Sequence, residues 1–393
     1  MMKQLKCILV LGALLVAAVG SAAVLPQKLR CEYRVDPLGI DVIQPRLSWI
    51  VTSAERGERQ TAYQILVASS PQLLRKDQGD LWDSGQVTSD ENTQVVYAGK
   101  PLESREGCFW KVRIWDAAGK CQGWSPVAGW TMGLLQPGDW SAQWISATAV
   151  AAAKSPLVIQ HASYEAVDGS GAVDVTATLA ARVQDNHLIV EVNNKSLGAD
   201  PVPNVHKRLV VDYLSDGQRH HQVVKETETL ALPEGINALR YLRKPFALKS
   251  SVKHAVLYAS ALGLYEVHLN GQRVGDHILA PDWTDYRKRV QYQTYDVTAL
   301  VKSGDNAMAA LLANGWYSGH IGNGGFQFFG RTPAFLAQLE VTYADGATER
   351  IVTDPSWRAQ ASPVLSSDFM MGEDYDARRE LPGWDQPGLD ESR

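Results

Sequence analysis

Residues 265–319 read YEVHLNGQRVGDHILAPDWTDYRKRVQYQTYDVTALVKSGDNAMAALLANGWYSG. The segment opens as an alternating strand and breaks at Asn270-Gly271, a dipeptide typical of tight hairpin turns. A polar loop with two aromatic residues follows at 281–286, and Asp-Val-Thr at 296–298 predicts the cap of one short helical turn. An apolar run at 307–312 predicts a buried strand. Short strands, tight turns and aromatic residues held on loops together predict a small jelly-roll sandwich.

The composition excludes one class of partner and favours another. The chain has 393 residues and a formal net charge of −5, and it shows no basic stripe, so we do not expect a nucleic-acid partner. Twelve Trp and fourteen Tyr stand against seven Phe. Trp and Tyr combine an apolar face with a polar edge, which suits stacking on sugars. The alternative is that the sandwich cores use these large aromatic side chains for packing.

The first 23 residues predict an export signal. Lys3 and Lys6 form a basic start, residues 8–19 are apolar, and small residues precede a cleavage point after Ala23. The apolar run is too short for a comfortable membrane span, so no span is expected after cleavage. The expected location of the mature protein is secreted or periplasmic.

Three cysteines remain after the predicted cleavage. Cys108 begins one expected strand and Cys121 follows the turn after it, so the two could form a disulfide across a hairpin. Three free thiols, including Cys31, are the alternative. No Cys or His spacing typical of a metal site is present.

The rest of the chain predicts further all-β domains. Residues 24–147 contain short alternating strands, such as 109–116, which predict a fibronectin type III or immunoglobulin-like β-sandwich. Residues 148–240 predict a β-rich inserted or accessory domain. Residues 241–372 predict the jelly-roll, and 373–393 a charged linker toward a further domain.

Several motifs from two parts of the chain together resemble the N-terminal region of bacterial α-L-rhamnosidases. In the jelly-roll they are Asn270-Gly271, APDWTDY at 280–286, YDVT at 295–298, NGWY at 314–317 and GEDYDAR at 372–378. In the first domain they are PLGID at 37–41, PRLSW at 45–49, QTAYQ at 60–64 and LWDSG at 81–85. The resemblance covers nearly all of the expected mature chain.

The resemblance implies an inverting glycoside hydrolase whose acidic pair lies on a downstream (α/α)₆ barrel. The sequence stops where that barrel is expected, so the family's catalytic acids have no positions here and no catalytic residue is predicted. We therefore expect a non-catalytic portion, with the barrel as its partner, that recognises or positions L-rhamnose-containing oligo- or polysaccharides. No cofactor is required. Because related modules bind rhamnose with the help of calcium, the resemblance leaves calcium open without naming its ligands.

The candidate sugar-contacting residues lie on the loops of the jelly-roll, where aromatic faces and hydrogen-bonding groups suit a sugar ring. They are Asp282, Trp283, Asp285, Tyr286, Asn270, Asn314 and Trp316. Each has a structural alternative: Asn270 favours the hairpin turn, and Trp316 favours core packing.

Two other functions compete with glycan binding. The chain could be a ligand-free scaffold that supports the barrel. Residual hydrolysis would need a carboxylate pair, for which Asp374 with Asp376 and Asp282 with Asp285 are the candidates.

Overall fold

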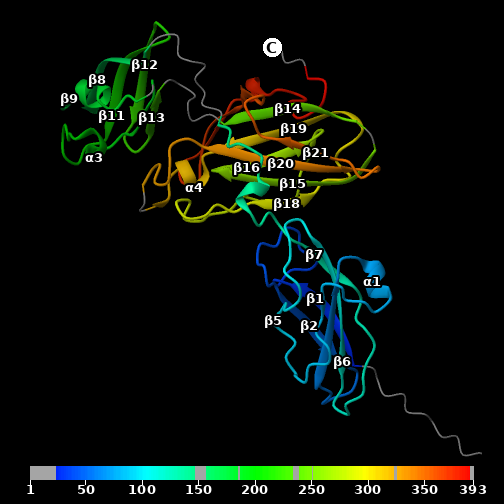
Figure 1. Ribbon diagram of the computed structural model, residues 1–393. Helices are drawn as coiled ribbons and strands as arrows, with labels where there is room; N and C mark the ends of the chain where they lie inside the picture. The colour runs from blue at the N-terminus through cyan, green and yellow to red at the C-terminus, as the bar shows by residue number, and fades with distance from the viewer. Residues whose placement is uncertain are drawn as a thin grey trace, which may run out of the picture. The chain divides into compact units, whose positions relative to one another are not determined.

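The computed structural model describes residues 24–146, 156–184, 186–232, 239–249, 251–322 and 325–389. The predicted export signal lies outside these residues. The chain divides into two compact units, Met1–Pro137 and Gly138–Arg393. Strands dominate both units, and the described α-helices have at most five residues, which confirms the all-β class (Figure 1). No helix among the described residues is long and apolar enough to cross a membrane.

The first unit is an immunoglobulin-like sandwich of two antiparallel sheets. One sheet has the order β1-β2-β5, with β1 (Leu25–Cys31), β2 (Arg46–Thr52) and β5 (Val95–Val96). The other has the order β4-β3-β6-β7, with β4 (Trp82–Asp83), β3 (Ala62–Ala68), β6 (Gly107–Trp115) and β7 (Ala128–Thr131). A short helix, α1 (Pro71–Arg75), follows β3. Trp49 and Trp110 are buried in this core, because alternate residues of a strand point to one face.

The three described cysteines are free thiols. Cys108 is buried on β6 opposite Trp130, whereas Cys121 is exposed and pairs with Trp115 near the other end of the same strand. The open alternative of a Cys108–Cys121 disulfide is therefore not realised, since the two residues meet different parts of β6.

The second unit begins with a smaller β domain. Its main sheet has the order β12-β11-β8-β9, formed by β12 (Gln218–Lys225), β11 (Lys207–Ser215), β8 (Val158–Ala166) and β9 (Ala172–Asp174). A two-stranded sheet of β10 (Leu188–Glu191) and β13 (Thr229–Leu232) completes it, with the short helices α2 (Thr176–Ala180) and α3 (Asn194–Leu197). Tyr164 is fully buried in the core of this domain.

Two sheets packed face to face form the jelly-roll (Figure 1). The five-stranded sheet contains β17 (Gln272–Arg273), β16 (Leu264–Leu269), β19 (Gly304–Ala313), β14 (Arg240–Leu248) and β22 (Arg358–Ala361). The four-stranded sheet contains β18 (Gln293–Asp296), β15 (Val252–Leu262), β20 (Ala334–Tyr343) and β21 (Thr348–Val352). A hairpin of β23 (Val364–Asp368) and β24 (Gly372–Tyr375), the helix α4 (Gly315–Ser318) and the turn η3 (Ala377–Arg379) complete the domain.

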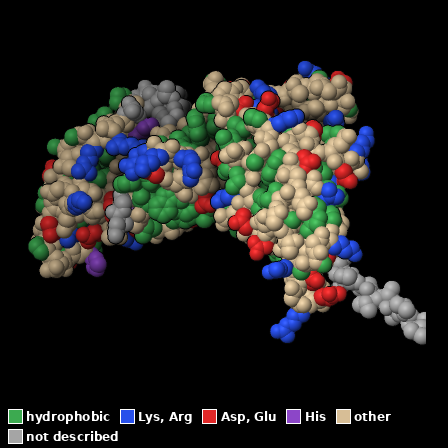
Figure 2. Space-filling view, turned by 60° about the horizontal axis from the view of Figure 1, so that its bottom comes forward, with side chains coloured by type: hydrophobic (Ala, Val, Ile, Leu, Met, Phe, Trp, Pro, Cys, Tyr) green, Lys and Arg blue, Asp and Glu red, His purple; other side chains and the backbone are tan. Residues whose placement is uncertain are grey.

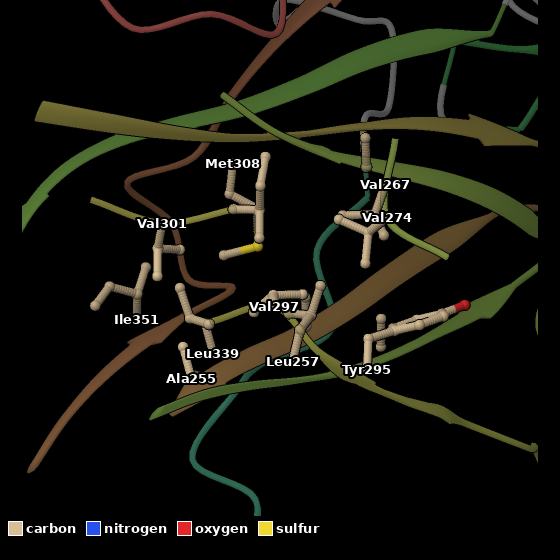
Figure 3. Close-up of a cluster of buried hydrophobic side chains, with 14 of the residues drawn as sticks. Ala255, Leu257, Val267, Val274, Tyr295, Val297, Val301, Met308, Leu339 and Ile351 are labelled. Atoms are coloured by element: carbon tan, nitrogen blue, oxygen red, sulfur yellow. The ribbon is translucent and has the colours of Figure 1, made fainter. Parts of the chain in front are cut away.

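The core of the jelly-roll lies between these two sheets. Figure 3 shows Val267 and Met308 from the larger sheet pointing toward Leu257 and Leu339 of the smaller one. Small residues alternate with large ones on β19, so the sheets approach closely. This packing confirms the buried strand expected at 307–312 and holds the loops at the sheet edges.

The segment Gly138–Ser146 packs with the jelly-roll, although the sequence suggested a domain boundary at 147. Ile145 pairs with Phe335, and the backbone N–H of Ser141 donates to Oε1 of Gln338 at 2.8 Å. Gln338 is fully buried, so this contact satisfies a polar group that would otherwise be costly. The first compact unit consequently ends at Pro137.

The C-terminal segment also packs on the jelly-roll, where the sequence suggested a loose linker. Trp384 stacks on Tyr241 with ring centroids 4.2 Å apart. Nδ1 of His268 lies 2.7 Å from a carboxylate oxygen of Asp385, and Nε2 lies 2.9 Å from Glu266. Elsewhere on the surface, Lys and Arg lie among Asp and Glu, with hydrophobic side chains between them (Figure 2).

Candidate functional site

Three aromatic rings from separate segments form a stack beside the jelly-roll core. Trp283 lies on the loop between β17 and β18, Trp316 on α4, and Phe369 on the turn between β23 and β24. The Trp283 and Trp316 rings are nearly parallel, with centroids 6.0 Å apart, and Trp316 stacks on Phe369 at 4.5 Å. Trp283 is 52% exposed and Phe369 44% exposed, so the stack presents aromatic faces to solvent. We refer to these three residues as the aromatic stack.

Sequence reasoning found two members of the aromatic stack and missed the third. Trp283 and Trp316 were candidates because they follow turns in a loop-rich stretch. Phe369 lies about fifty residues further along, in SDFMMG at 367–372, where no turn or polar aromatic motif marks it. Only the pairing of β23 with β24 brings it next to Trp316.

Tyr286, a second candidate for stacking, is buried and supports the loop. It is 8% exposed and makes edge contacts with the rings of Tyr317 and Phe329. Its hydroxyl donates a hydrogen bond to the carbonyl of Asp282 at 3.3 Å. Burial, with the nearby Asp282 charge, raises the pKa of Tyr286 to about 12. The ring fixes the position of the Trp283 loop, and neither face is free to cover a sugar.

The two loop carboxylates have different surroundings. Asp282 is exposed and has a positive φ of 90°, and its side chain accepts only from the N–H of Trp283, among the hydrogen bonds of the described residues. Asp285 accepts from Nε of Arg287 at 3.1 Å and lies 3.7 Å from Nζ of Lys288. The Arg287 hydrogen bond holds the pKa of Asp285 below its ordinary value. Asp282 therefore remains free for a ligand, while Asp285 is paired within the loop.

Asn270 has a structural role in the hairpin. Its amide N–H₂ donates to the Leu300 carbonyl and to Oδ1 of Asn306, both at 2.8 Å, and its Oδ1 accepts from the N–H of Ala307 at 2.8 Å. Its φ of 52° matches the left-handed conformation that Asn tolerates in tight turns. These contacts use both N–H donors of the amide and one lone pair of its oxygen, so Asn270 has no donor left for a sugar hydroxyl.

Asn314 caps the start of α4, two positions before Trp316. Its Oδ1 accepts from the hydroxyl of Ser318 at 3.1 Å, and it lines a pocket of the second unit. The structure thus places Asn314 in a pocket with His320 and Asp368, whereas Asn270 holds the hairpin of the fold.

The loop fits calcium poorly. Calcium takes six to eight oxygen ligands. Asp285 already faces two cations, Arg287 and Lys288. No group of three or more His, Cys, Asp or Glu among the described residues could hold a metal ion.

The carboxylates of Asp374, on β24, and of Asp376, just before η3, both accept hydrogen bonds from neighbouring side chains. Asp376 receives two hydrogen bonds from Arg378 and also lies near Arg379, and the Arg378 hydrogen bond lowers its pKa to about 2. Such a group stays ionised at neutral pH and cannot serve as a general acid. Asp374 accepts a hydrogen bond from Ser366 at 2.7 Å.

Sequence reasoning also missed a pair next to the aromatic stack, the buried His320 and the partly buried Asp368. Nδ1 of His320 lies 3.0 Å from Oδ2 of Asp368, and both residues line the same pocket as Asn314. His320 follows NGWY by two residues, and Asp368 directly precedes Phe369. No local pattern marks either residue, since forty-eight positions separate them.

The fold and these loops define a class: a multidomain β-sandwich protein with an immunoglobulin-like first domain and a jelly-roll that carries an exposed aromatic surface. Family models refine the class. Residues 26–136 match the Rha78A-like, N-terminal immunoglobulin domain, and residues 250–393 match the alpha-L-rhamnosidase N-terminal domain. Residues 141–233 match the model of the DnaJ-like protein C11, C-terminal. The chain therefore carries N-terminal domains of the α-L-rhamnosidase family.

Curated relatives give the same family. An alpha-L-rhamnosidase of Streptomyces avermitilis is 39% identical over 446 aligned residues, which cover 92% of this chain and 43% of that protein. One from Alteromonas sp. (strain LOR) is 34% identical and one from Formosa agariphila 33% identical; each alignment covers 91% of this chain and 31% of the relative. The chain therefore spans less than half the length of these relatives.

Solved structures agree with the fold. The S. avermitilis alpha-L-rhamnosidase complexed with L-rhamnose matches with a TM-score of 0.73 and 35% identity, over 94% of this chain and 44% of that one. The alpha-L-rhamnosidase of Dictyoglumus thermophilum matches with a TM-score of 0.68 and 30% identity, over 95% of this chain and 34% of that one.

Proposed function

We propose that this chain is the β-sandwich portion of an exported α-L-rhamnosidase, and that its jelly-roll binds and positions L-rhamnose-containing glycans. Inverting hydrolysis of terminal α-L-rhamnosides would belong to the whole protein, on a barrel that supplies the acidic pair. The export segment predicted at residues 1–23 favours a secreted or periplasmic site of action.

The aromatic stack is the observation that carries this proposal. A sugar ring has one face rich in C–H groups, which packs on an aromatic surface, while its hydroxyls need polar partners. Trp283 and Phe369 expose aromatic surface at the two ends of the stack. Asp282 adjoins Trp283 and offers a free carboxylate oxygen for two vicinal hydroxyls.

Calorimetric titration of the chain with L-rhamnose and with methyl α-L-rhamnoside tests the proposal. We expect Trp283→Ala to weaken binding about tenfold or more, because it removes an aromatic ring that the bound sugar would cover. Trp144→Ala is the matched control, because Trp144 is also a half-exposed Trp but lies outside the stack. The control should bind like the unchanged chain.

The same titration decides between binding and scaffolding. Absence of heat with either ligand, with and without calcium, would favour a scaffold that only supports the barrel. Binding that appears only with calcium would place a metal in the site, against the poor fit of the Asp282 and Asp285 loop. Binding that is equal with calcium and with chelator is the expected result.

A further inference from the structure

The buried His320 and the partly buried Asp368 form a pair that glycan binding by the aromatic stack does not use. His320 lies just after α4, and Asp368 is the last residue of β23, directly before Phe369. Nδ1 of His320 lies 3.0 Å from Oδ2 of Asp368, and the backbone N–H of His320 donates to the same oxygen at 2.8 Å. The pair therefore joins the two segments that carry Trp316 and Phe369.

The surroundings of Asp368 fix which imidazole nitrogen carries the proton. Oδ1 of Asp368 accepts from the backbone N–H groups of Met370 and Met371. Burial raises the pKa of Asp368, but the hydrogen bonds from Met370 and His320 outweigh it, so the pKa lies below its ordinary value. An ionised carboxylate can only accept, so Nδ1 must donate. When the ring carries a single proton, Nε2 is then the nitrogen with the lone pair.

That lone pair has no partner among the described residues. His320 is 7% exposed, and Nε2 makes no hydrogen bond within the described residues. The half-buried ring of Phe326 lies against the imidazole, with centroids 4.7 Å apart. A buried and unpaired polar atom is unusual in a folded protein and calls for a ligand, a water or a functional reason.

The wall around His320 suits a neutral, hydroxyl-rich ligand. His320, Asp368 and Phe326 line one pocket together with hydroxyl, amide and charged side chains of the jelly-roll: Asn314, Ser366, Ser367, Asp374, Tyr375, Asp376, Arg378 and Arg379. Arg378 and Arg379 both form ion pairs with Asp376. Neither arginine is therefore available to balance the negative charges of Asp368 and Asp374 in this pocket. An anionic ligand is disfavoured there.

We propose that this wall is a second sugar subsite, in which Nε2 of His320 accepts a hydrogen bond from a hydroxyl of a neutral sugar adjoining the rhamnose on the aromatic stack. The proposal rests on the proposed function, since the stack would hold the first sugar. The second sugar displaces the edge of the Phe326 ring and gives Nε2 the partner it lacks.

Titration of the full chain with two probes tests the subsite: L-rhamnose alone, and the disaccharide α-L-rhamnosyl-(1→6)-D-glucose. His320→Asn keeps a donor at the position of Nδ1 for Asp368 and removes Nε2. We expect this variant to bind the disaccharide about tenfold more weakly and L-rhamnose unchanged, as for the loss of one hydrogen bond. His254→Asn, at an exposed histidine of β15, is the matched control and should change neither affinity.

Trp283→Ala separates the two proposals. If it weakens both probes while His320→Asn weakens neither, the stack binds rhamnose and the second subsite is overturned. If it weakens neither probe while His320→Asn weakens the disaccharide, His320 contacts the disaccharide, but the stack does not hold rhamnose and the placement of the second sugar beside the stack is overturned. Absence of binding to both probes overturns both proposals. The corresponding uronic acid disaccharide should bind more weakly than the neutral one, and tighter binding would contradict the neutral ligand.

A measurement on the unchanged chain keeps the proposal testable if His320→Asn fails to fold. Long-range ¹H–¹⁵N spectra report the protonation of each imidazole nitrogen. We expect His320 to be the Nδ1–H tautomer and its Nε2 resonance to shift when the disaccharide is added. An Nε2 resonance that does not move at saturating disaccharide would overturn the proposal.

Discussion

At the scale of single residues, Asn270 shows how one amide can hold a sheet edge. Its three hydrogen bonds join the hairpin to the carbonyl of Leu300, to the fully buried Asn306 and to the N–H of Ala307. Asn306 in turn accepts from the N–H of Lys302 and donates to the carbonyls of Lys302 and Gly304. These two asparagines fasten the 300–306 turn to the β16–β17 hairpin.

Replacement of Asn270 separates hydrogen bonding from backbone conformation. Asn270→Gly removes the side-chain contacts but accepts the positive φ, so we expect a loss of about 2 kcal/mol in the free energy of unfolding. Asn270→Ala adds the cost of a left-handed residue, about 1 kcal/mol more. Urea unfolding followed by Trp fluorescence measures both changes. If the two variants are equally stable, the left-handed backbone at position 270 carries no cost for Ala. If both unfold at the same urea concentration as the unchanged chain, the side-chain hydrogen bonds of Asn270 do not stabilise the fold.

Two aromatic residues of one loop show which features of the site the sequence could predict. Trp283 and Tyr286 lie three positions apart on one loop, and their side chains are equally able to stack on a sugar. Packing against Tyr317 and Phe329 buries Tyr286, while Trp283 stays half exposed. Those neighbours come from segments about thirty residues or more further along, so no local pattern could separate the two aromatic residues.

At the scale of elements, the C-terminal segment contributes a patch of side chains to the outer face of the larger sheet. Trp384 covers Tyr241 of β14 and lies against His268 of β16, with ring centroids 4.2 and 5.1 Å away. Arg243 donates to the carbonyl of Gln386 at 2.8 Å, and Gly271 donates to the carbonyl of Asp385 at 2.9 Å. The side chains and backbone together fasten this segment to the sheet.

Loss of the Trp384 ring should loosen this segment. Arg378 and Arg379 lie just before it, so trypsin cleavage at these residues reports its opening. We expect Trp384→Ala to speed that cleavage about tenfold, since the stacking and burial it loses are worth more than 1 kcal/mol.

Two further variants sharpen the protease test. His268→Ala leaves the buried carboxylate of Asp385 without its Nδ1 partner and should act in the same direction. Trp144→Ala, at a half-exposed Trp away from the segment, should cleave at the unchanged rate. If Trp384→Ala also cleaves at the unchanged rate, the stack on Tyr241 does not hold the segment.

At the scale of the whole molecule, buried tyrosines make the fold sensitive to alkali. Burial raises the pKa of Tyr97 in the first sandwich, Tyr164 in the smaller β domain and Tyr265 in the jelly-roll. An unfolded Tyr loses its proton near pH 10. Above that pH the unfolded state binds fewer protons than the folded state, so the free energy of unfolding falls as pH rises.

We therefore expect the contribution of these tyrosines to stability to be constant from neutral pH to about pH 10 and to be lost as pH rises toward 12 and beyond. Tyrosinate absorbance should then rise together with the loss of Trp fluorescence from the folded cores, because these hydroxyls ionise as the chain unfolds. Tyr286→Phe should lessen the slope of stability against pH in this range, since it removes one group whose pKa is raised to about 12. Complete ionisation near pH 10 with the fold intact would contradict the prediction.

The sequence by itself determined the all-β class, the order of the sandwich domains and the hairpin at Asn270-Gly271. These depend on alternation along strands and on turn residues, which act over a few neighbouring positions. It also determined the family through motifs kept in order along the chain. Only the tertiary structure decided which loop side chains meet. The ring of Phe369, the pairing of His320 with Asp368 and the burial of Tyr286 each depend on contacts between segments distant in sequence. The stretch 265–319 therefore predicts a jelly-roll with an aromatic loop, but packing sets which of its aromatic residues a ligand can reach.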